Sequence, residues 1–416
     1  MPNDAEILRA LFDAALNAAL PEGKFDGRLP PKPQGRTIVL GAGKASARMA
    51  TAFEEAWTRA GGTCEGLVVT RYGHAAPTRS VEIVEASHPV PDEAGVNAAR
   101  RILALAQQAG PDDLVVCLMS GGASALLSLP AEGVTLADKQ SLNRALLKSG
   151  APIGEMNLVR KSLSAIKGGR LAAAAGKAQL VTYLISDVPG DDPGSIGSGP
   201  TIPERVDPDV ALSILRKYGI DVPNHVLQAI KANVVNGAPA SGALHMLATP
   251  KMALDAAAAK AREFGLSPLI LGDAVEGEAR EVGRVMAGIA QSARRHGDPV
   301  RAPCVLLSGG ETTVTVRGQG RGGRNAEFLL SLALELKGEA TISAIACDTD
   351  GIDGSEDNAG AWFDPMLHER AQEMGMDLAS YLASNDAYTA FAELGRLVVT
   401  GPTLTNVNDF RGILIR

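Results

Sequence analysis

Residues 37–50 read TIVLGAGKASARMA, an apolar run followed by a glycine turn and then a helical pattern. The apolar run is typical of a buried strand. Gly41 and Gly43 flank the turn, and Lys44 opens the helical stretch. Backbone N–H groups at the start of a helix favour a phosphate or a carboxylate. The segment therefore predicts a strand and a helix joined by an anion-binding loop, although a turn without a ligand remains an alternative.

The same order of strand, small-residue loop and helical pattern recurs along most of the chain. We expect strands at 37–40, 67–69, 81–85, 114–119, 180–186, 243–248, 267–272, 303–308, 341–347 and 396–400. We expect helices at 44–60, 93–109, 250–264, 275–296 and 323–336. Apolar strands that alternate with helices predict an α/β fold, in which the sheets are covered on both faces and are largely parallel.

The length of 416 residues is typical of two or three domains. Segments 201–209 and 235–242 contain the Pro and Gly residues of connections, and a pair of helical patterns lies between them. We therefore expect a first domain at 1–240 and a second at 241–416.

The overall composition narrows the classes of protein that the chain can represent. Hydrophobic residues make up 45% and charged residues 21%, an ordinary balance for a globular protein. Aromatic residues make up only 4% and the net charge is −7, which argues against binding to nucleic acid. No run approaches the ~20 apolar residues of a membrane span, so no membrane partner is expected. The amphipathic N-terminus and four cysteines without a CxxC pair predict a cytoplasmic protein.

A second small-residue loop follows the strand expected at 114–119. It consists of Ser120, Gly121, Gly122, Ala123 and Ser124. A ligand can approach bare backbone closely at such a loop. The order of residues departs from the GxSxG of a hydrolase nucleophile elbow. An anion cradle is the favoured interpretation, with a simple packing turn as the alternative.

A third loop combines glycines with cations. Gly309, Gly310 and Glu311 form a turn after a strand, and Arg324 and Asn325 open the helix at 323–336. A guanidinium can grip two oxygens of a phosphate or carboxylate at once. A helix dipole disfavours a cation at this end. We therefore expect an anionic ligand beside Arg324 to offset that cost.

Two further loops are rich in carboxylates, and both follow expected strands. Asp187 and Asp191 stand in the first, and Asp348 and Asp353 stand in the second. Mg²⁺ uses one or two protein carboxylates and completes its shell with phosphate and water, so these four are the expected metal ligands. Asp187 and Asp191 are also candidates for the general base. Solvated turn residues are the alternative, and the second loop does not match an EF-hand.

Taken together, these loops resemble the glycerate 2-kinase family whose C-terminal region is called the MOFRL domain. The resemblance covers nearly the whole chain. Its most specific stretches are GAGKAS (41–46), SGGASALL (120–127), KSGAPIGEMNLVRKSLSAIKGGRLA (148–172), SDVPGDDPGSIGSGPT (186–201), SGGETTVTV (308–316), GRGGRNAEF (320–328), DTDGIDG (348–354) and GPTLTNVND (401–409).

The resemblance implies a Rossmann-like N-terminal domain, a smaller MOFRL-type α/β domain and an active site in the cleft between them. It implies transfer of the γ-phosphoryl group of ATP to the 2-hydroxyl of D-glycerate, giving 2-phosphoglycerate. Lys44 and Arg324 match the basic residues of the family's active site. Phosphoryl transfer also needs further cations and Mg²⁺. Arg160 and Asn408 complete the expected binding residues.

Two other functions stay open. Some members of the family carry the name hydroxypyruvate reductase, in tartrate-degradation contexts, which suggests an NAD(P)-dependent enzyme. Against this, Ser46 stands where a GxGxxG fingerprint needs Gly or Ala, and Thr70 and Arg71 stand where it needs an acid. A binding protein for an organic acid or nucleotide would require fewer cations and acids. The expected partners are D-glycerate and ATP, and a homodimer is left open.

Overall fold

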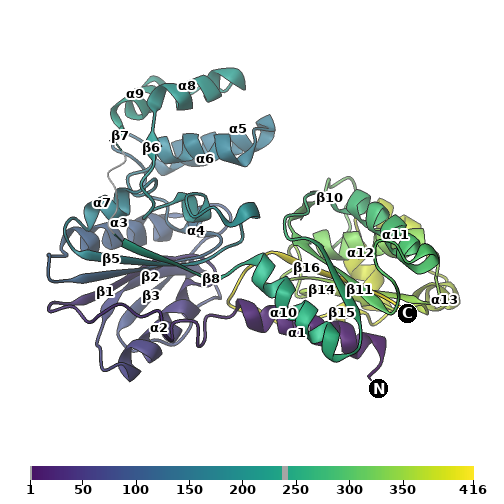
Figure 1. The fold of residues 1–416 in the computed structure, drawn as a ribbon. Helices are drawn as coiled ribbons and strands as arrows, with labels where there is room; N and C mark the ends of the chain where they lie inside the picture. The colour runs from purple at the N-terminus through teal and green to yellow at the C-terminus, as the bar shows by residue number, and fades with distance from the viewer. Residues whose placement is uncertain (1, 237–241) are drawn as a thin grey trace. The chain divides into compact units, whose positions relative to one another are not determined.

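The computed structural model describes residues 2–236 and 242–416 (Figure 1). These residues form two units. The central unit is Pro21–Leu247, and the terminal unit combines the residues up to Leu20 with Ala248–Arg416. The expected boundary, between residues 240 and 241, lies outside the described residues. The expected active site in a cleft between two domains stays a prediction.

The first 20 residues differ from the expected division, because they belong to the terminal unit. Helix α1 (Asp4–Ala19) packs against α10 (Pro250–Glu263), and its apolar stripe is buried. The Asp4 carboxylate also pairs with Arg416 at 2.8 Å. An amphipathic helix buries its apolar face on whichever surface fits it. One domain boundary along the sequence therefore cannot describe the terminal unit, because residues from both ends of the chain form it.

One six-stranded sheet forms the centre of the central unit, in the order β3-β2-β1-β4-β5-β8. Neighbouring strands from β3 to β5 run parallel, as expected. The strands are β1 (Thr37–Ala42), β2 (Glu65–Arg71), β3 (Val81–Ala86), β4 (Leu114–Met119), β5 (Gln179–Ile185) and β8 (Gly242–Ala248). Because parallel strands point the same way, the loops after β1, β4 and β5 lie at one edge of the sheet.

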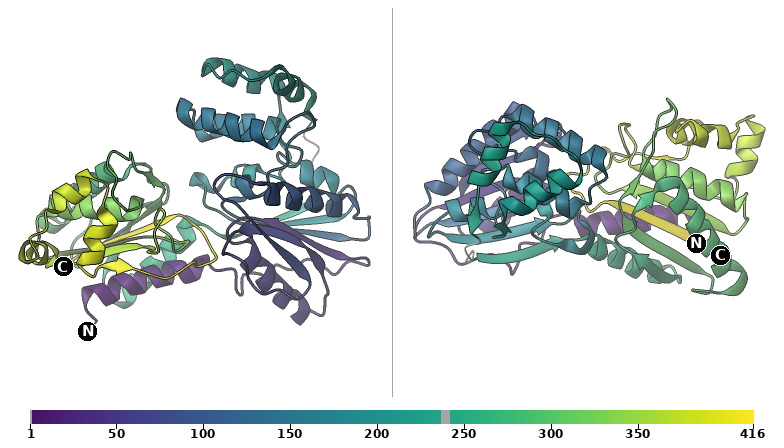
Figure 2. Two further views of the ribbon diagram at one scale, coloured as in Figure 1. Left: turned by 180° about the vertical axis from the view of Figure 1, so that it is seen from behind. Right: turned by 90° about the horizontal axis from the view of Figure 1, so that it is seen from above.

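Helices cover both faces of this sheet (Figure 1 and, from behind, Figure 2). On one face lies α2 (Ser46–Arg59), and on the other lie α3 (Glu93–Gln107), α4 (Ala123–Leu126) and α7 (Arg170–Ala174). Two 3₁₀ turns, at Pro189–Asp191 and Ile196–Ser198, follow β5.

A further layer of helices lies beyond α4 and α7 (Figure 1). It consists of α5 (Leu136–Ser149), α6 (Ile153–Ser162), α8 (Pro208–Lys217) and α9 (Asn224–Ala232), with the short strands β6 (Arg205–Val206) and β7 (Val235–Asn236). These helices share an apolar cluster of their own, which includes Leu142, Val159, Leu215 and Ile230. The helical pair expected between residues 209 and 235 corresponds to α8 and α9.

The sheet of the terminal unit has the order β15-β14-β13-β16-β11-β9. Its strands are β9 (Ser267–Gly272), β11 (Cys304–Gly310), β13 (Ile342–Asp348), β14 (Gly360–Phe363), β15 (Leu397–Val398) and β16 (Asp409–Ile415). Only β9 and β11 run parallel, and the other neighbours are antiparallel. The expectation of largely parallel sheets is therefore wrong for this sheet. The last strand of the chain, β16, enters between β11 and β13 with the opposite direction, which apolar periodicity does not reveal.

The helices of the terminal unit also lie on two faces. On one face α1 and α10 pack on the sheet, and on the other lie α11 (Ala279–His296) and α12 (Arg324–Leu336). The short α14 (Leu378–Ala383) and α15 (Ala387–Glu393) pack against α12, α13 (Leu367–Glu373) precedes them, and β10 (Gly277–Glu278) pairs with β12 (Thr312–Thr313). None of the described helices, in either unit, is long and apolar enough to cross a membrane.

Candidate active site

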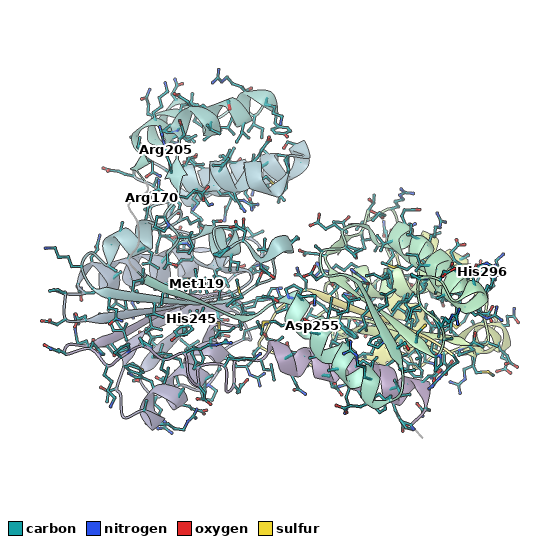
Figure 3. The ribbon with its side chains drawn as sticks, viewed as in Figure 1. Met119, Arg170, Arg205, His245, Asp255 and His296 are labelled. Atoms are coloured by element: carbon teal, nitrogen blue, oxygen red, sulfur yellow. The ribbon has the colours of Figure 1, made fainter. Side chains whose placement is uncertain are left out.

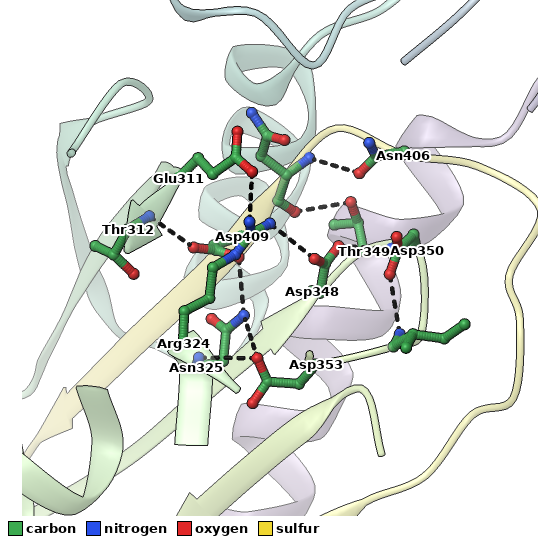
Figure 4. A network of polar contacts seen from close by, with 12 residues as sticks. Glu311, Thr312, Arg324, Asn325, Asp348, Thr349, Asp350, Asp353, Asn406 and Asp409 are labelled. Carbon is green, nitrogen blue, oxygen red and sulfur yellow. Dashed lines mark hydrogen bonds and ion pairs between the residues drawn. The ribbon is translucent and has the colours of Figure 1, made fainter. Parts of the chain in front are cut away.

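Strand register brings distant residues of the terminal unit into one row. Asp409, the first residue of β16, lies opposite Gly310 of β11 and opposite Asp348 of β13. Arg324 is the first residue of α12, and it reaches this row. Expected residues from three separate loops thus meet at one end of the sheet (Figure 4).

Arg324 forms ion pairs with three carboxylates (Figure 4), and we call these four residues the arginine–carboxylate cluster. Its Nη1 lies 2.5 Å from Glu311, its Nη2 2.8 Å from Asp348 and its Nε 2.8 Å from Asp409. Burial lowers the pKa of Arg324, but the charges of Asp409, Asp348 and Glu311 outweigh burial and raise it. The guanidinium is therefore charged at every working pH.

The dipole of α12 disfavours a cation at its first residue, and three protein carboxylates offset this unfavourable interaction. The sequence analysis expected an anionic ligand to do so. The three partners differ in exposure. Asp409 is fully buried and Asp348 is nearly so, whereas the Glu311 side chain is 50% exposed. Glu311 is therefore the partner that an incoming anion would displace most easily.

Asp409 was missed by sequence reasoning, and it is the centre of the network. Its Oδ1 accepts hydrogen bonds from Arg324 and from the Asn325 amide, both at 2.8 Å. Its Oδ2 accepts from the buried Arg411 at 2.5 Å. Among the residues that the structure describes, the buried Asn325 Oδ1 has no hydrogen-bond partner. The hydrogen bonds to Asp409 nevertheless hold the Arg324 guanidinium and the Asn325 amide in fixed positions.

Asp353 uses both carboxylate oxygens at the start of α12. They accept from the backbone N–H groups of Asn325 at 2.9 Å and Ala326 at 2.8 Å. Burial raises the pKa of Asp353 to about 6, against the lowering effect of these hydrogen bonds. Asp353 therefore satisfies donors that the helix itself leaves open. Its expected role as a metal ligand stays a prediction, and this geometry favours a structural role.

Three other expected residues contribute through the backbone. Gly309 and Gly310 belong to β11 and not to a turn, and the Gly309 carbonyl accepts from Arg411 at 3.3 Å. Asn408 has a φ of 64°, and its carbonyl accepts from Thr349 Oγ1 at 2.8 Å. This left-handed residue orients the chain immediately before Asp409.

In the central unit, the loops after β1 and β4 are bonded to each other. The backbone N–H of Lys44 donates to the carbonyl of Gly121 at 2.8 Å. The N–H of Ala45 donates to Ser120 Oγ at 3.0 Å. Gly41 lies in β1 itself. The two expected anion-binding loops therefore form one continuous surface at the edge of the sheet.

Two glycines make this close approach possible. A Cβ on Gly43 would lie 2.1 Å from Ser120 Oγ, so no larger residue fits. Gly122 has a φ of +82°, and a Cβ there would lie 3.2 Å from both Lys44 Cγ and His88 Nε2. The side chains of Lys44 and His88 therefore lie against the backbone of the loop after β4. His88 is not among the expected site residues, because from the sequence, before Pro89 and without an HxH or HExxH pattern, it predicts a surface or packing role.

Lys167 contacts this loop and lies within electrostatic reach of three further cations. We call the four residues Lys139, Arg160, Lys161 and Lys167 the cation cluster. Lys167 is 2% exposed, and its Nζ donates to the carbonyl of Ser124 at 2.5 Å. Arg160 donates to the amide oxygens of Asn143 and Asn157. Lys161 pairs with Glu204. Arg160 is among the expected binding residues, and Lys161 and Lys167 lie in the family-like stretch 148–172. Lys139 lies outside every motif that the sequence analysis singled out.

Arg170, by contrast, holds the surrounding backbone. It donates to the carbonyls of Lys161, Lys167 and Asn233, at 3.1, 2.9 and 2.9 Å. Figure 3 places it at the base of the helical layer. Arg170 thus fixes the end of α6 and the turn before α7, which carry the cluster.

The loop after β5 carries Asp187 and Asp191, and both are half-buried. Asp191 has a φ of 55°, and its N–H donates to the carbonyl of Val188 at 3.0 Å. Within residues 2–236 and 242–416, no group of three or more Asp, Glu, His or Cys is placed to hold a metal ion. Mg²⁺ needs only one or two carboxylates when phosphates complete its shell, so the expected metal site stays a prediction.

Comparison with known proteins places the chain in a family. Residues 7–231 match a family described as "Domain of unknown function (DUF4147)", and residues 304–409 match the MOFRL family. A protein of Agrobacterium vitis, provisionally named hydroxypyruvate reductase, is 56% identical over 99% of this chain and 94% of its own length. The D-glycerate 2-kinase of Thermotoga maritima is 40% identical over 95% of this chain and 94% of its own length.

A solved structure agrees with these matches. The crystal structure of a glycerate kinase from Thermotoga maritima superposes with a TM-score of 0.90 at 39% identity, and the match covers 99% of each chain. The expected α/β fold with a MOFRL-type second domain is therefore confirmed. With both regions matched and relatives aligned over nearly their whole length, the chain belongs to the MOFRL-domain glycerate kinase family.

Proposed function

We propose that this protein is a kinase that transfers the γ-phosphoryl group of ATP to the 2-hydroxyl of D-glycerate, giving 2-phosphoglycerate. The observation that carries the proposal is the gathering of cations around the joined loops after β1 and β4. Phosphoryl transfer depends on positioning and on cations that stabilise the charge of the moving group. The 40% identity to the D-glycerate 2-kinase of Thermotoga maritima supports the choice of substrate.

Lys44 is the proposed catalytic cation of the central unit. Its side chain lies against the backbone of Gly122, in the loop at the carboxyl end of β4. Ligands of parallel sheets bind at this end. The ammonium group is proposed to stabilise the transferred phosphoryl group, while Ser120, Gly121, Gly122 and Ser124 supply the cradle.

Arg324 is proposed to bind the carboxylate of D-glycerate. Its guanidinium already pairs with carboxylates, and Glu311 is the exposed one. A substrate carboxylate carries the same charge and geometry as the Glu311 side chain, so it can replace Glu311 without loss of pairing. The buried Asp409 and Asp348 would keep Arg324 in place during this exchange.

Mg²⁺ is proposed to bind at the loop after β5. The oxygens of Asp348 accept from Arg324 and from the backbone N–H of Asp350, and both oxygens of Asp353 are occupied as well. Asp187 and Asp191 follow β5, which lies beside β4, so they fit a metal shared with phosphates better. Bound Mg²⁺ would neutralise phosphate charge. Asp187 is also proposed as the acceptor of the 2-hydroxyl proton, in which case Asp191 would be the carboxylate that holds the metal.

The second candidate is an NAD(P)-dependent hydroxypyruvate reductase, because the relative at 56% identity carries that name provisionally. The loop after β1 argues against it. The hydroxyl of Ser46 lies 2.7 Å from the Gly43 carbonyl and 2.9 Å from the Val69 carbonyl, where a dinucleotide fold uses a small residue for close packing. β2 ends in Thr70 and Arg71, without an acid for a ribose.

The test separates the two activities in one preparation. The protein is incubated with D-glycerate, ATP and Mg²⁺, and separately with hydroxypyruvate and NADH or NADPH. We expect ADP that depends on D-glycerate in the first mixture and no loss of reduced nucleotide in the second. Oxidation of NAD(P)H in the second mixture, without D-glycerate-dependent ADP in the first, would contradict the kinase function and support the reductase function.

A further inference from the structure

The cation cluster of the central unit contains more basic side chains than acidic partners. Lys139 comes from α5, Arg160 and Lys161 from the end of α6, and Lys167 from the turn before α7. Within the described ranges, only Lys161 has an ion pair, with Glu204. Arg160 and Lys167 donate to neutral oxygens of amides and of the backbone.

Lys139 is the clearest sign of a missing partner. Its Nζ is buried, and among the residues that the structure describes it has no hydrogen-bond partner. Burial and the neighbouring charge of Arg160 lower the pKa of Lys139 to about 7. Burial and the charges of Lys139, Arg160 and Lys161 hold the pKa of Lys167 well below its ordinary value. Buried charges are costly unless they are paired, so the cluster is suited to an anion that arrives from outside.

The cluster adjoins the loop that the proposed function assigns to phosphate. Lys167 Nζ bonds to the carbonyl of Ser124, the last residue of that cradle. The Ser124 hydroxyl in turn lies 2.8 Å from the hydroxyl of Ser198, in the second 3₁₀ turn of the loop after β5. The loops after β4 and β5 and the cation cluster therefore meet in one region of the central unit.

The amount of charge indicates the class of anion. Four cations and one carboxylate, Glu204, leave about three positive charges without a protein partner when all four side chains are protonated. The single negative charge of D-glycerate would leave most of them unpaired. A triphosphate chain carries three to four negative charges and several acceptor oxygens, which matches this surplus.

We propose that the cation cluster binds the triphosphate chain of the nucleotide co-substrate, with Lys139 as the residue whose charge the ligand completes. This proposal rests on the kinase function proposed above. It assigns Lys139 and Lys167 to nucleotide binding and leaves the carboxylate of D-glycerate to Arg324.

The test uses the full chain and three variants. Lys139→Met and Lys167→Met remove the charge but keep an unbranched side chain that is only one atom shorter. Lys148→Met is the matched control, because Lys148 is exposed on the same helix as Lys139. Binding of ATP, adenosine and inorganic tripolyphosphate is measured by titration calorimetry, and KM is measured for ATP and for D-glycerate. Thermal melting verifies that each variant is folded.

We expect Lys139→Met to weaken ATP and tripolyphosphate by about tenfold or more, as loss of a charged hydrogen bond does, and to leave adenosine unchanged. The KM for D-glycerate should stay at the wild-type value, and Lys148→Met should behave like wild type. Folded Lys139→Met and Lys167→Met variants with wild-type affinity for tripolyphosphate would overturn the proposal. So would variants whose KM rises for D-glycerate alone.

The two proposals fail separately. An active D-glycerate kinase whose Lys139 and Lys167 variants keep the wild-type KM for ATP would refute the nucleotide site and leave the function standing. A wild-type protein that binds tripolyphosphate through Lys139 but phosphorylates no D-glycerate would support the anion site and refute the function.

Discussion

At the scale of single residues, the sequence identified Arg324 but not what surrounds it. Its position after two glycines at a helix start marked it as a ligand-binding residue. The carboxylates that pair with it stand 13, 24 and 85 positions away along the chain. Local patterns carry no information on such pairs, because strand register creates them.

The ion pairs reverse one expectation about stability. From the sequence alone, loss of Arg324 is expected to leave the stability of the ligand-free fold level or to raise it slightly, because the helix dipole disfavours a cation at this end. In the structure, Arg324→Ala leaves the buried carboxylates of Asp409 and Asp348 without this cation. We therefore predict a loss of ~3–5 kcal/mol in the free energy of unfolding, measured by urea denaturation. Arg321→Ala is the control, because Arg321 is exposed and its pair with Glu356 is screened by solvent, so this variant should unfold close to wild type.

Arg324→Lys tests the catalytic role of the same residue. Lysine keeps the charge but cannot bind two oxygens in a fixed plane. We predict a fall in kcat/KM for D-glycerate of about tenfold or more, which corresponds to ~1.4 kcal/mol. Steady-state kinetics at saturating ATP measure it. Wild-type kcat/KM in a folded Arg324→Lys protein would remove Arg324 from substrate binding.

Asp353 predicts a pH dependence of stability. Burial raises its pKa from the ordinary 3.8 to about 6, so the folded state holds this proton more tightly than the unfolded state. The resulting stabilisation is fully present below pH ~4 and is lost as the pH rises through about 6. Asp353→Asn lacks this titration. The melting temperature of wild type minus that of Asp353→Asn should therefore fall between pH 4 and 7, and a difference that grows over this range would contradict the assignment.

At the scale of elements, apolar runs located most strands and helices well. The strands expected at 114–119 and 267–272 and the helix at 323–336 lie within one residue of β4, β9 and α12. The strand β16 was missed, because DFRGILI contains two charges and a glycine. Those charges, Asp409 and Arg411, neutralise each other inside the protein, which a pattern of single residues does not show.

The loop after β5 predicts the metal dependence of the reaction. EDTA should abolish turnover, and added Mg²⁺ should restore it, because the phosphates of ATP need a partner cation. Asp187→Asn and Asp191→Asn should each raise the Mg²⁺ concentration for half-maximal rate by about tenfold or more. Asp192→Asn, in the same loop but bonded to Ser195, is the control.

The same measurement separates the two roles proposed for Asp187. A lost metal ligand is compensated by more Mg²⁺, whereas a lost proton acceptor lowers kcat at saturating Mg²⁺ as well. Unchanged Mg²⁺ dependence in both variants would place the metal elsewhere, with Asp348 as the next candidate.

At the scale of the whole molecule, the fold class and the family followed from the sequence, but the division into units did not. Connections rich in Pro and Gly marked a boundary near residue 240, and the central unit ends at Leu247. Nothing local in residues 4–19 indicates that they complete a unit formed by the other end of the chain. Residues 4–19 belong to the terminal unit because α1 packs on α10 and Asp4 forms an ion pair with Arg416.

A substitution in α1 tests this arrangement. Leu11 is fully buried in the terminal unit, so Leu11→Ala should lower the free energy of unfolding by ~2–5 kcal/mol. Asn17→Ala, on an exposed position of the same helix, is the control. Denaturation of the full chain measures both. A Leu11→Ala protein as stable as wild type would show that α1 does not contribute to the core.

The central claim is that the chain phosphorylates the 2-hydroxyl of D-glycerate, and identification of the product tests it most directly. D-glycerate, ATP and Mg²⁺ are incubated with the protein, and the phosphomonoester is identified by ³¹P NMR and by its conversion with enolase alone. The account predicts 2-phosphoglycerate, which enolase consumes without a mutase. A product that enolase leaves untouched until a phosphoglycerate mutase is added, or no phosphorylated product at all, would contradict it.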